Sequence, residues 1–170
     1  LFIASGAGAY TCGITLQPNV IVVGDGSSST LQAVSAVTPV LGSNFVPYAT
    51  FTGTNPLLET TTSGLHCFTL ATDNTIRGVT INDVGVAGDA YDIFGANFGT
   101  FNTLETQLIG TGGALNLTTG ALNGQITTIT VTQSSGYGVF LNGVSGTLVS
   151  SATGTSDTVS EGIRIENSSV

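Results

Sequence analysis

The chain has 170 residues, of which 41% are hydrophobic and only 7% are charged; it contains two arginines and no lysine against ten acidic residues. The formal charge of −8 excludes the cationic surface that nucleic acids and anionic lipids require, and no apolar run reaches the length of a membrane-spanning segment. The length suits one domain with an exterior of uncharged Thr, Ser, Asn and Gln.

Short strands with period-two alternation are predicted at the N-terminal end, over residues 1–3, 14–16 and 21–23. Asn19 separates the second and third of these strands, at a position where the chain must bend sharply. We expect Ile14, Leu16, Ile21 and Val23 to point into a core.

Residues 27–63 interrupt this pattern. Pro39, Pro47 and Pro56 remove backbone donors that interior strands need, so the segment cannot consist of regular strands throughout. We predict one irregular coil around residues 41–51 together with a lateral loop. Such an excursion is either a binding surface or a capping loop.

Regular strands resume at residues 68–70, and a second type of strand follows with apolar residues spaced by three and then two. Ile76, Val79 and Ile81 have this spacing, which is repeated at residues 126–131 and, with a polar centre, at 104–109 and 144–149. Each structural unit would therefore contain a first and a second strand.

The C-terminal third contains a repeat of 24 residues. Leu115, Val139 and Ile163 are separated by this interval, as are Leu117, Leu141 and Ile165, whereas Asn116, Phe140 and Arg164 between them vary. A period-two strand that recurs at this interval is typical of stacked coils with an inside and an outside. A small residue precedes each second strand by two positions and is predicted to form a ladder of turns: Asn19, Asn74, Asn102, Gly124 and Asn142.

Residues 13–26 and 70–81 resemble rungs of right-handed parallel β-helices of the pectate-lyase-like superfamily, especially repeat-rich secreted and cell-surface proteins of bacteria. The resemblance implies an all-β, single-stranded parallel solenoid with one lateral excursion. We predict a single domain over 1–170, with about six or seven coils at about 4.8 Å per coil. We expect it to be an excerpt of a longer chain or a filament subunit.

Candidate chemistry is concentrated in one acidic stretch. Asp73, Asp83, Asp89 and Asp92 flank one predicted coil, with Arg77 beside them. Pectate lyases, which the rungs resemble, use calcium and a basic proton acceptor, and only Arg77 could take that second role here. Ordinary turn roles are predicted for these residues and no cofactor is predicted, with calcium bound at Asp83, Asp89 and Asp92 as the alternative. No catalytic residue is predicted.

Cys12, His66 and Cys67 are the remaining reactive side chains. Neighbours on a strand point to opposite faces, so His66 and Cys67 are not expected to form a nucleophile pair. Aligning Ile14 with Phe68 places the two thiols on opposite faces, which argues against a disulfide unless the strand edge bends.

Three function classes are open. The first is a structural or adhesive module, extracellular or on the cell surface, whose partners are further copies stacked end to end, a larger parent chain, or surface glycans. The second is a polysaccharide-binding or polysaccharide-degrading β-helix, and the third is an ice- or mineral-binding surface.

Overall fold

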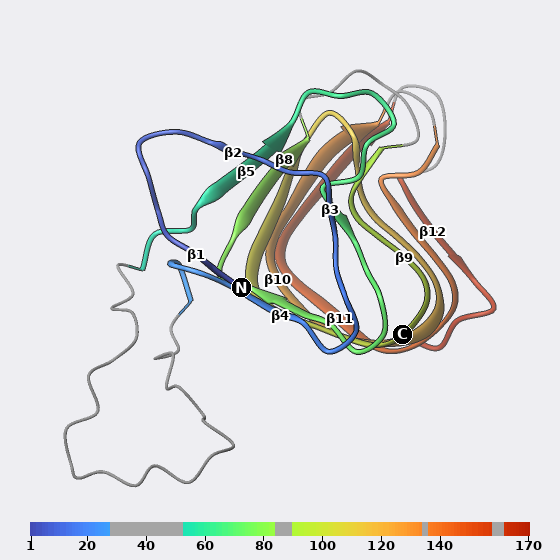
Figure 1. Ribbon diagram of the computed structural model, residues 1–170. Coiled ribbons are helices and arrows are strands. Elements are labelled where there is room, and N and C mark those ends of the chain that lie inside the picture. The colour runs from blue at the N-terminus through green and yellow to red at the C-terminus, as the bar shows by residue number, and fades with distance from the viewer. Residues whose placement is uncertain (28–52, 84–89, 134–135, 158–161) are drawn as a thin grey trace, which may run out of the picture.

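The structure is a computed structural model that describes residues 1–27, 53–83, 90–133, 136–157 and 162–170. Its strands are parallel and wind into a β-solenoid of about five turns, with no helix in these residues. Figure 1 shows the coils nested behind one another around a shared interior. The described residues accordingly contain no helix that is long and apolar enough to cross a membrane.

Short strands form the N-terminal coils, and long strands that bend around the corners form the later ones. The short strands are β1 (Phe2–Ile3), β2 (Tyr10–Thr11), β3 (Ile14–Thr15), β4 (Ile21–Gly24), β5 (Leu57–Thr60), β6 (Phe68–Thr69), β7 (Thr75–Arg77) and β8 (Thr80–Asp83). The later strands are β9 (Tyr91–Gly110), β10 (Gly113–Gln133), β11 (Val139–Asp157) and β12 (Ile163–Glu166).

The pairing of these strands defines three faces. The first face contains β3, β6, the N-terminal parts of β9, β10 and β11, and then β12. The second face contains β1, β4, β7 and the middle parts of the long strands. The third face contains β2, β5, β8 and the C-terminal parts of the long strands.

The 24-residue repeat is confirmed as the length of one coil between β10, β11 and β12. Leu115 pairs with Val139, and Val139 pairs with Ile163, in parallel register. Side chains at these positions alternate between the interior and the outside, so Leu115, Leu117, Val139 and Leu141 are buried. Burial of this apolar column, at about 25 cal/mol per Å² of surface removed from water, stabilises the stack.

Three residues predicted in the core are exposed instead: Ile21 by 54%, Ile163 by 50% and Ile165 by 52%. Val22, not Ile21, pairs with Ile76, so the strand after the Asn19 turn is shifted by one residue and Ile21 points outward. Ile163 and Ile165 keep the expected register, but β12 pairs only with β11, and no described strand covers its other edge.

The second strands predicted from the three-then-two spacing are present, since residues 104–109 lie in β9 and residues 144–149 lie in β11. The polar-centred matches differ from Ile76 and Ile126 in burial. Leu104 and Ile109 are only half-buried, and Phe101 and Leu108 are the buried residues in this part of β9. Val149 is likewise exposed. Register shifts between β9 and β10 accompany the outward position of Leu104, because each shift exchanges inside and outside.

The number of coils was also overestimated, since the structure has about five turns instead of six or seven. Within the predicted excursion over 27–63, β5 supplies a regular strand of the third face. The irregular coil predicted around residues 41–51, with Pro39 and Pro47, lies outside the described residues.

Candidate functional site

Two of the predicted acidic residues meet at one corner of the solenoid. Asp83 is the last residue of β8, and Asp92 is the second residue of β9, so both lie where the third face gives way to the first. Both are buried, with 1% of Asp83 and none of Asp92 exposed. Carboxylates are seldom buried to this extent without a charged or hydrogen-bonding partner.

Asp92 is held in a strongly perturbed environment. Burial raises the pKa of its carboxyl well above the usual value, and the nearby charge of Asp83 raises it further. The backbone N–H of Asp83 lowers the pKa in part. This contact between the Asp83 N–H and the Asp92 carboxylate is not a well-formed hydrogen bond, because neither carboxylate oxygen of Asp92 has a hydrogen-bond partner.

A glycine-rich turn of the following coil closes over this corner. Thr111 donates from both its N–H and its hydroxyl to the carbonyl oxygen of Asp83, at 2.7 and 3.2 Å. Gly113 N–H donates to the carbonyl oxygen of Ala90 at 3.0 Å. A Cβ on Gly112 would lie 2.2 Å from Asp83 Oδ2 and 3.1 Å from the Ala90 oxygen. A larger residue here would require the Asp83 carboxylate to move.

The chain has few basic side chains, and both arginines form ion pairs with glutamates. It has no lysine. Arg77 Nη2 lies 3.1 Å from Glu105 Oε2, and Arg164 pairs with Glu166. Two adjacent carboxyls repel each other when both are ionised, and they can share a proton.

Two other predicted site residues, Asp73 and Arg77, have partners away from this corner. Asp73 is exposed in a turn, with φ of 60°, and its Oδ1 accepts a hydrogen bond from Thr100 N–H at 2.8 Å. Asp89 lies outside the described residues. Within the described ranges, no three His, Cys, Asp or Glu side chains are grouped so as to hold a metal ion.

The predicted turn ladder is correct only at its first position. Asn19 has a positive φ of 63°, but Asn74, Asn102, Gly124 and Asn142 do not. The residues with positive φ at this corner of successive coils are Asn19, Asp73, Asn97, Thr119, Gly143 and Asn167. The bend therefore begins nearer to the first strand than the sequence suggested.

Asparagines do connect neighbouring coils by hydrogen bonds. Asn74 is buried and donates from Nδ2 to the carbonyl oxygen of Gln17 at 2.8 Å. Asn123 Nδ2 donates to Asn102 Oδ1 at 3.1 Å, and another asparagine pair, Asn167 and Asn142, has the same arrangement at 3.2 Å. Their role in this structure is to join coils.

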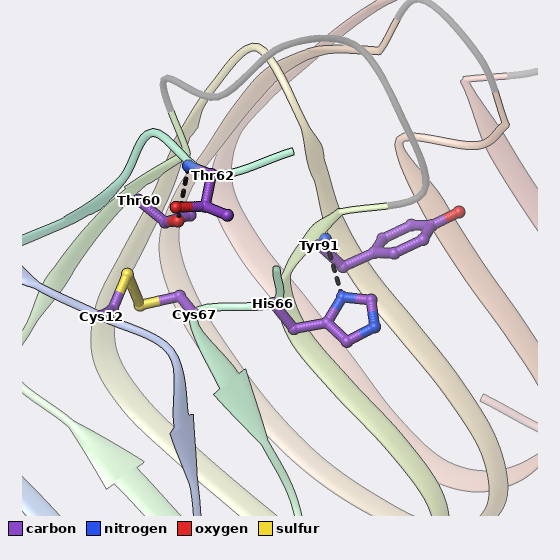
Figure 2. The surroundings of a disulfide bond; sticks show 6 residues. All are labelled: Cys12, Thr60, Thr62, His66, Cys67 and Tyr91. Carbon is purple, nitrogen blue, oxygen red and sulfur yellow. Dashed lines mark hydrogen bonds between the residues drawn. A yellow bond between two sulfur atoms is a disulfide. The ribbon is translucent and has the colours of Figure 1, made fainter. Parts of the chain in front are cut away.

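Cys12 and Cys67 form a disulfide, with Cα atoms 4.7 Å apart, which overturns the parity argument (Figure 2). The N–H groups of Gly13 and Ile14 both donate to the Cys67 carbonyl oxygen, at 3.1 and 2.8 Å, and Gly13 has φ of 116°. This bulge rotates Cys12 toward its partner. His66 points away from Cys67, and its Nδ1 accepts the Tyr91 N–H at 3.1 Å, so no nucleophile pair forms.

Sequence reasoning missed a row of aromatic side chains on the outside of the first face. The register aligns Phe94, Asn116, Phe140 and Arg164 along the stack. The His66 ring stacks on Phe94 at 4.4 Å between centroids. The only signal in the sequence was that the variable, outward-facing positions of the 24-residue repeat include Phe140 and Arg164.

The C-terminal part of this row forms a second stack. Tyr137 stacks on Phe140 at 5.3 Å between ring centroids, and the Arg164 guanidinium lies 5.1 Å from the Tyr137 centroid. Arg164 Nη1 also donates to the Tyr137 hydroxyl at 2.5 Å. Together with His66, Phe94 and Asn116, these residues are called the aromatic row below.

Two grooves accompany these features. A shallow groove of about 370 Å³ on the second face is lined by Asn102, Asn123, Gln125 and Thr147, among others. A more apolar groove of about 230 Å³ lies beside β12 and is lined by Leu148, Ile163, Ile165 and neighbouring residues.

Comparisons with family models, curated proteins and solved structures found no match to this chain.

Proposed function

We propose that this chain is a structural or adhesive module of an extracellular or cell-surface protein, related to the pectate-lyase-like β-helices that its rungs resemble. The observation that carries the proposal is the disulfide between Cys12 and Cys67, which links two neighbouring coils. Such bonds persist in oxidising compartments and are rare in the cytosol of mesophiles. A rod of stacked coils with few charges is well suited to a mechanical or display role.

The location can be tested with the protein in the cells that make it. Iodoacetamide alkylation before and after reduction, read by intact mass, reports the state of both cysteines. Protease treatment of intact cells reports whether the protein is at the surface. We expect protection from alkylation until reduction, and loss of the protein on protease treatment. Two free thiols in a protease-resistant protein would overturn the assignment.

Self-association or continuation in a larger chain is part of this proposal. The apolar groove beside β12 supports it, and so does the outer edge of that strand, which no strand of the described residues covers, because exposed strand edges pair readily with further strands. Native mass and electron micrographs of the protein from its source give the test. We expect filaments or a mass above 17.0 kDa. Monodisperse monomers of that mass at high concentration would contradict this part of the proposal.

Glycan binding is the second candidate function, and the aromatic row favours it. Aromatic faces provide apolar platforms, and the Asn116 amide and the Arg164 guanidinium provide hydrogen bonds beside them. The row follows the stack axis, so it could contact several units of a linear polymer. The Asp83–Asp92 corner is a weaker candidate for polysaccharide cleavage, because both carboxylates are buried.

Affinity electrophoresis in gels containing neutral or acidic polysaccharides tests glycan binding. We expect retardation of the wild-type chain and its loss in Phe140→Ala, with Thr127→Ala, an exposed residue between the second and third faces, as the matched control. Equal retardation of both variants would exclude the aromatic row. Cleavage products that disappear in Asp83→Ala would replace the structural proposal with an enzymatic one.

The ice- or mineral-binding alternative has less support. A regular surface of this kind needs one residue type repeated along the stack, and the outward row of the second face is mixed, with Thr75, Asn102, Asn123 and Thr147 in order. An ice-recrystallisation assay addresses it directly.

A further inference from the structure

We propose that the β12 end of the solenoid is a self-complementary surface, on which two copies of this chain pair tail to tail about a twofold axis through Ile165. The inference rests on the self-association part of the proposed function and makes the partner specific. A second copy in the opposite orientation closes the assembly as a dimer, whereas head-to-tail contacts would continue into a filament.

The apolar interior of the solenoid is uncovered at this end. Ile163 and Ile165 continue the inward columns of Val139 and Leu141, but they are 50% and 52% exposed. Their side chains line the apolar groove of about 230 Å³. At the opposite edge of the same face, Leu16, which follows β3, is only 4% exposed. On the first face, the apolar surface that needs a cover therefore lies beside β12.

The backbone of β12 directs hydrogen-bonding groups toward its outer edge. Val139 N–H donates to the Gly162 carbonyl oxygen at 2.9 Å, on the side of β11. Alternate residues of a parallel strand bond to the same neighbour, so the N–H and C=O groups of Ile163 and Ile165 face away from β11. No strand of the described residues lies on that side. An antiparallel strand centred on Ile165 matches these groups, because two opposed residues in such a pair exchange both bonds.

The outward side chains of β12 are complementary to themselves. Arg164 and Glu166 flank Ile165 and pair with each other on the outer face. In an antiparallel pair centred on Ile165, Arg164 of each copy lies opposite Glu166 of the other. Opposite charges placed across a strand pair stabilise it. A head-to-tail contact would instead set these charges against β3, where the exposed residue is Thr15. The charge pattern therefore favours the tail-to-tail arrangement.

The same axis keeps the two interiors continuous. A twofold axis perpendicular to the first face leaves the inward side of the sheet inward in both copies. Ile163 and Ile165 of one copy then cover those of the other, and this burial contributes about 25 cal/mol for each Å² of apolar surface removed from water. The pair also covers the β12 edge of both copies, which would otherwise be open to further strands.

Cross-linking through one added cysteine tests the position of the axis. The full 170-residue chain carries Ile165→Cys or, as the matched control, Ile163→Cys, and is oxidised mildly with the native disulfide intact. Opposed residues in a hydrogen-bonded antiparallel pair have Cα atoms about 5.5 Å apart, within reach of a disulfide. The two copies of position 163 lie about 14 Å apart, since each is opposite position 167. We expect a covalent dimer from Ile165→Cys and none from the control.

Sedimentation velocity of charge variants tests the cross-strand pairs. Wild type at about 0.1 mM should sediment as a dimer, with twice the 17.0 kDa mass of the chain. Arg164→Glu and Glu166→Arg, each alone, place like charges opposite each other and should weaken dimerisation about tenfold. An equimolar mixture of the two variants restores opposite charges between copies but not within one copy, so it should recover the dimer. Circular dichroism of each variant controls for folding.

The outcomes separate this inference from the proposal on which it rests. Monomeric wild type at this concentration would overturn both the tail-to-tail pair and the self-association. Growth beyond a dimer, or cross-linking of position 163 as readily as position 165, would leave self-association in place and overturn the tail-to-tail pair. A mixture of charge variants that stays monomeric would show that Arg164 and Glu166 act only within their own strand, which also overturns it.

Discussion

Replacing both cysteines with alanine removes a link that closes a long loop in the unfolded chain. Cys12 and Cys67 are 55 residues apart. In the chain-entropy treatment, closing a loop of this length lowers the entropy of the unfolded state by about 14 cal/mol/K, which is about 4 kcal/mol at 25 °C. Alanine is the appropriate substitute because both side chains are buried and a serine hydroxyl would need a partner.

For 170 residues the entropy of unfolding is about 0.36 kcal/mol/K, so this loss corresponds to a decrease in Tm of about 11 °C. Urea unfolding of the double variant and of the wild type, with and without a reductant, gives the free energy of unfolding directly. We expect the reductant to lower the wild type to the level of the variant and to leave the variant unchanged. A loss below about 1 kcal/mol would refute the account that the bridge closes this loop in the native protein.

Three further outcomes follow from the structure. Gly24→Ala should unfold the protein or lower its Tm strongly, because a Cβ would lie 2.0 Å from the Gly78 carbonyl oxygen, whereas Gly8→Ala, with nothing within 4 Å, should be neutral. Leu117→Ala should cost about 2–5 kcal/mol in urea unfolding, because its side chain is fully buried. In EDTA, the free energy of unfolding of the wild type should fall as pH rises from about 4 toward the raised pKa of Asp92, because the folded state binds the proton more tightly than the unfolded state. Asp92→Asn should flatten this pH dependence.

The fold could be predicted because the sequence repeats with the period of the structure. Leu115, Val139 and Ile163 recur at one interval, and that interval is the register between β10, β11 and β12. Spacing alone fails where the corners differ in length. The shift after Asn19 turns Ile21 outward, and the bulge at Gly13 brings Cys12 to Cys67, because one extra residue at a corner reverses the parity of everything that follows.

The candidate site could be predicted only in part. Asp83 and Asp92 stood out as acidic residues close in sequence, but the sequence did not show that Gly112, in the turn of the following coil, lies against Asp83. Asp73 and Arg77 are also close to these residues in sequence, but Asp73 contacts Thr100 and Arg77 pairs with Glu105 instead. The aromatic row needed the register between coils, since Phe94 and Phe140 are neighbours of Asn116 only after the coils are stacked.

The stacking register itself is tested most directly by cysteine cross-linking in the variant without Cys12 and Cys67. Asn116 and Phe140 are paired outward positions on adjacent coils, so cysteines placed there should form a disulfide rapidly under mild oxidation. Cysteines at positions 116 and 141 should remain reduced, because Leu141 is buried and points to the opposite side of the strand. Rapid oxidation of the second pair, or none of the first, would contradict the parallel solenoid with a 24-residue coil.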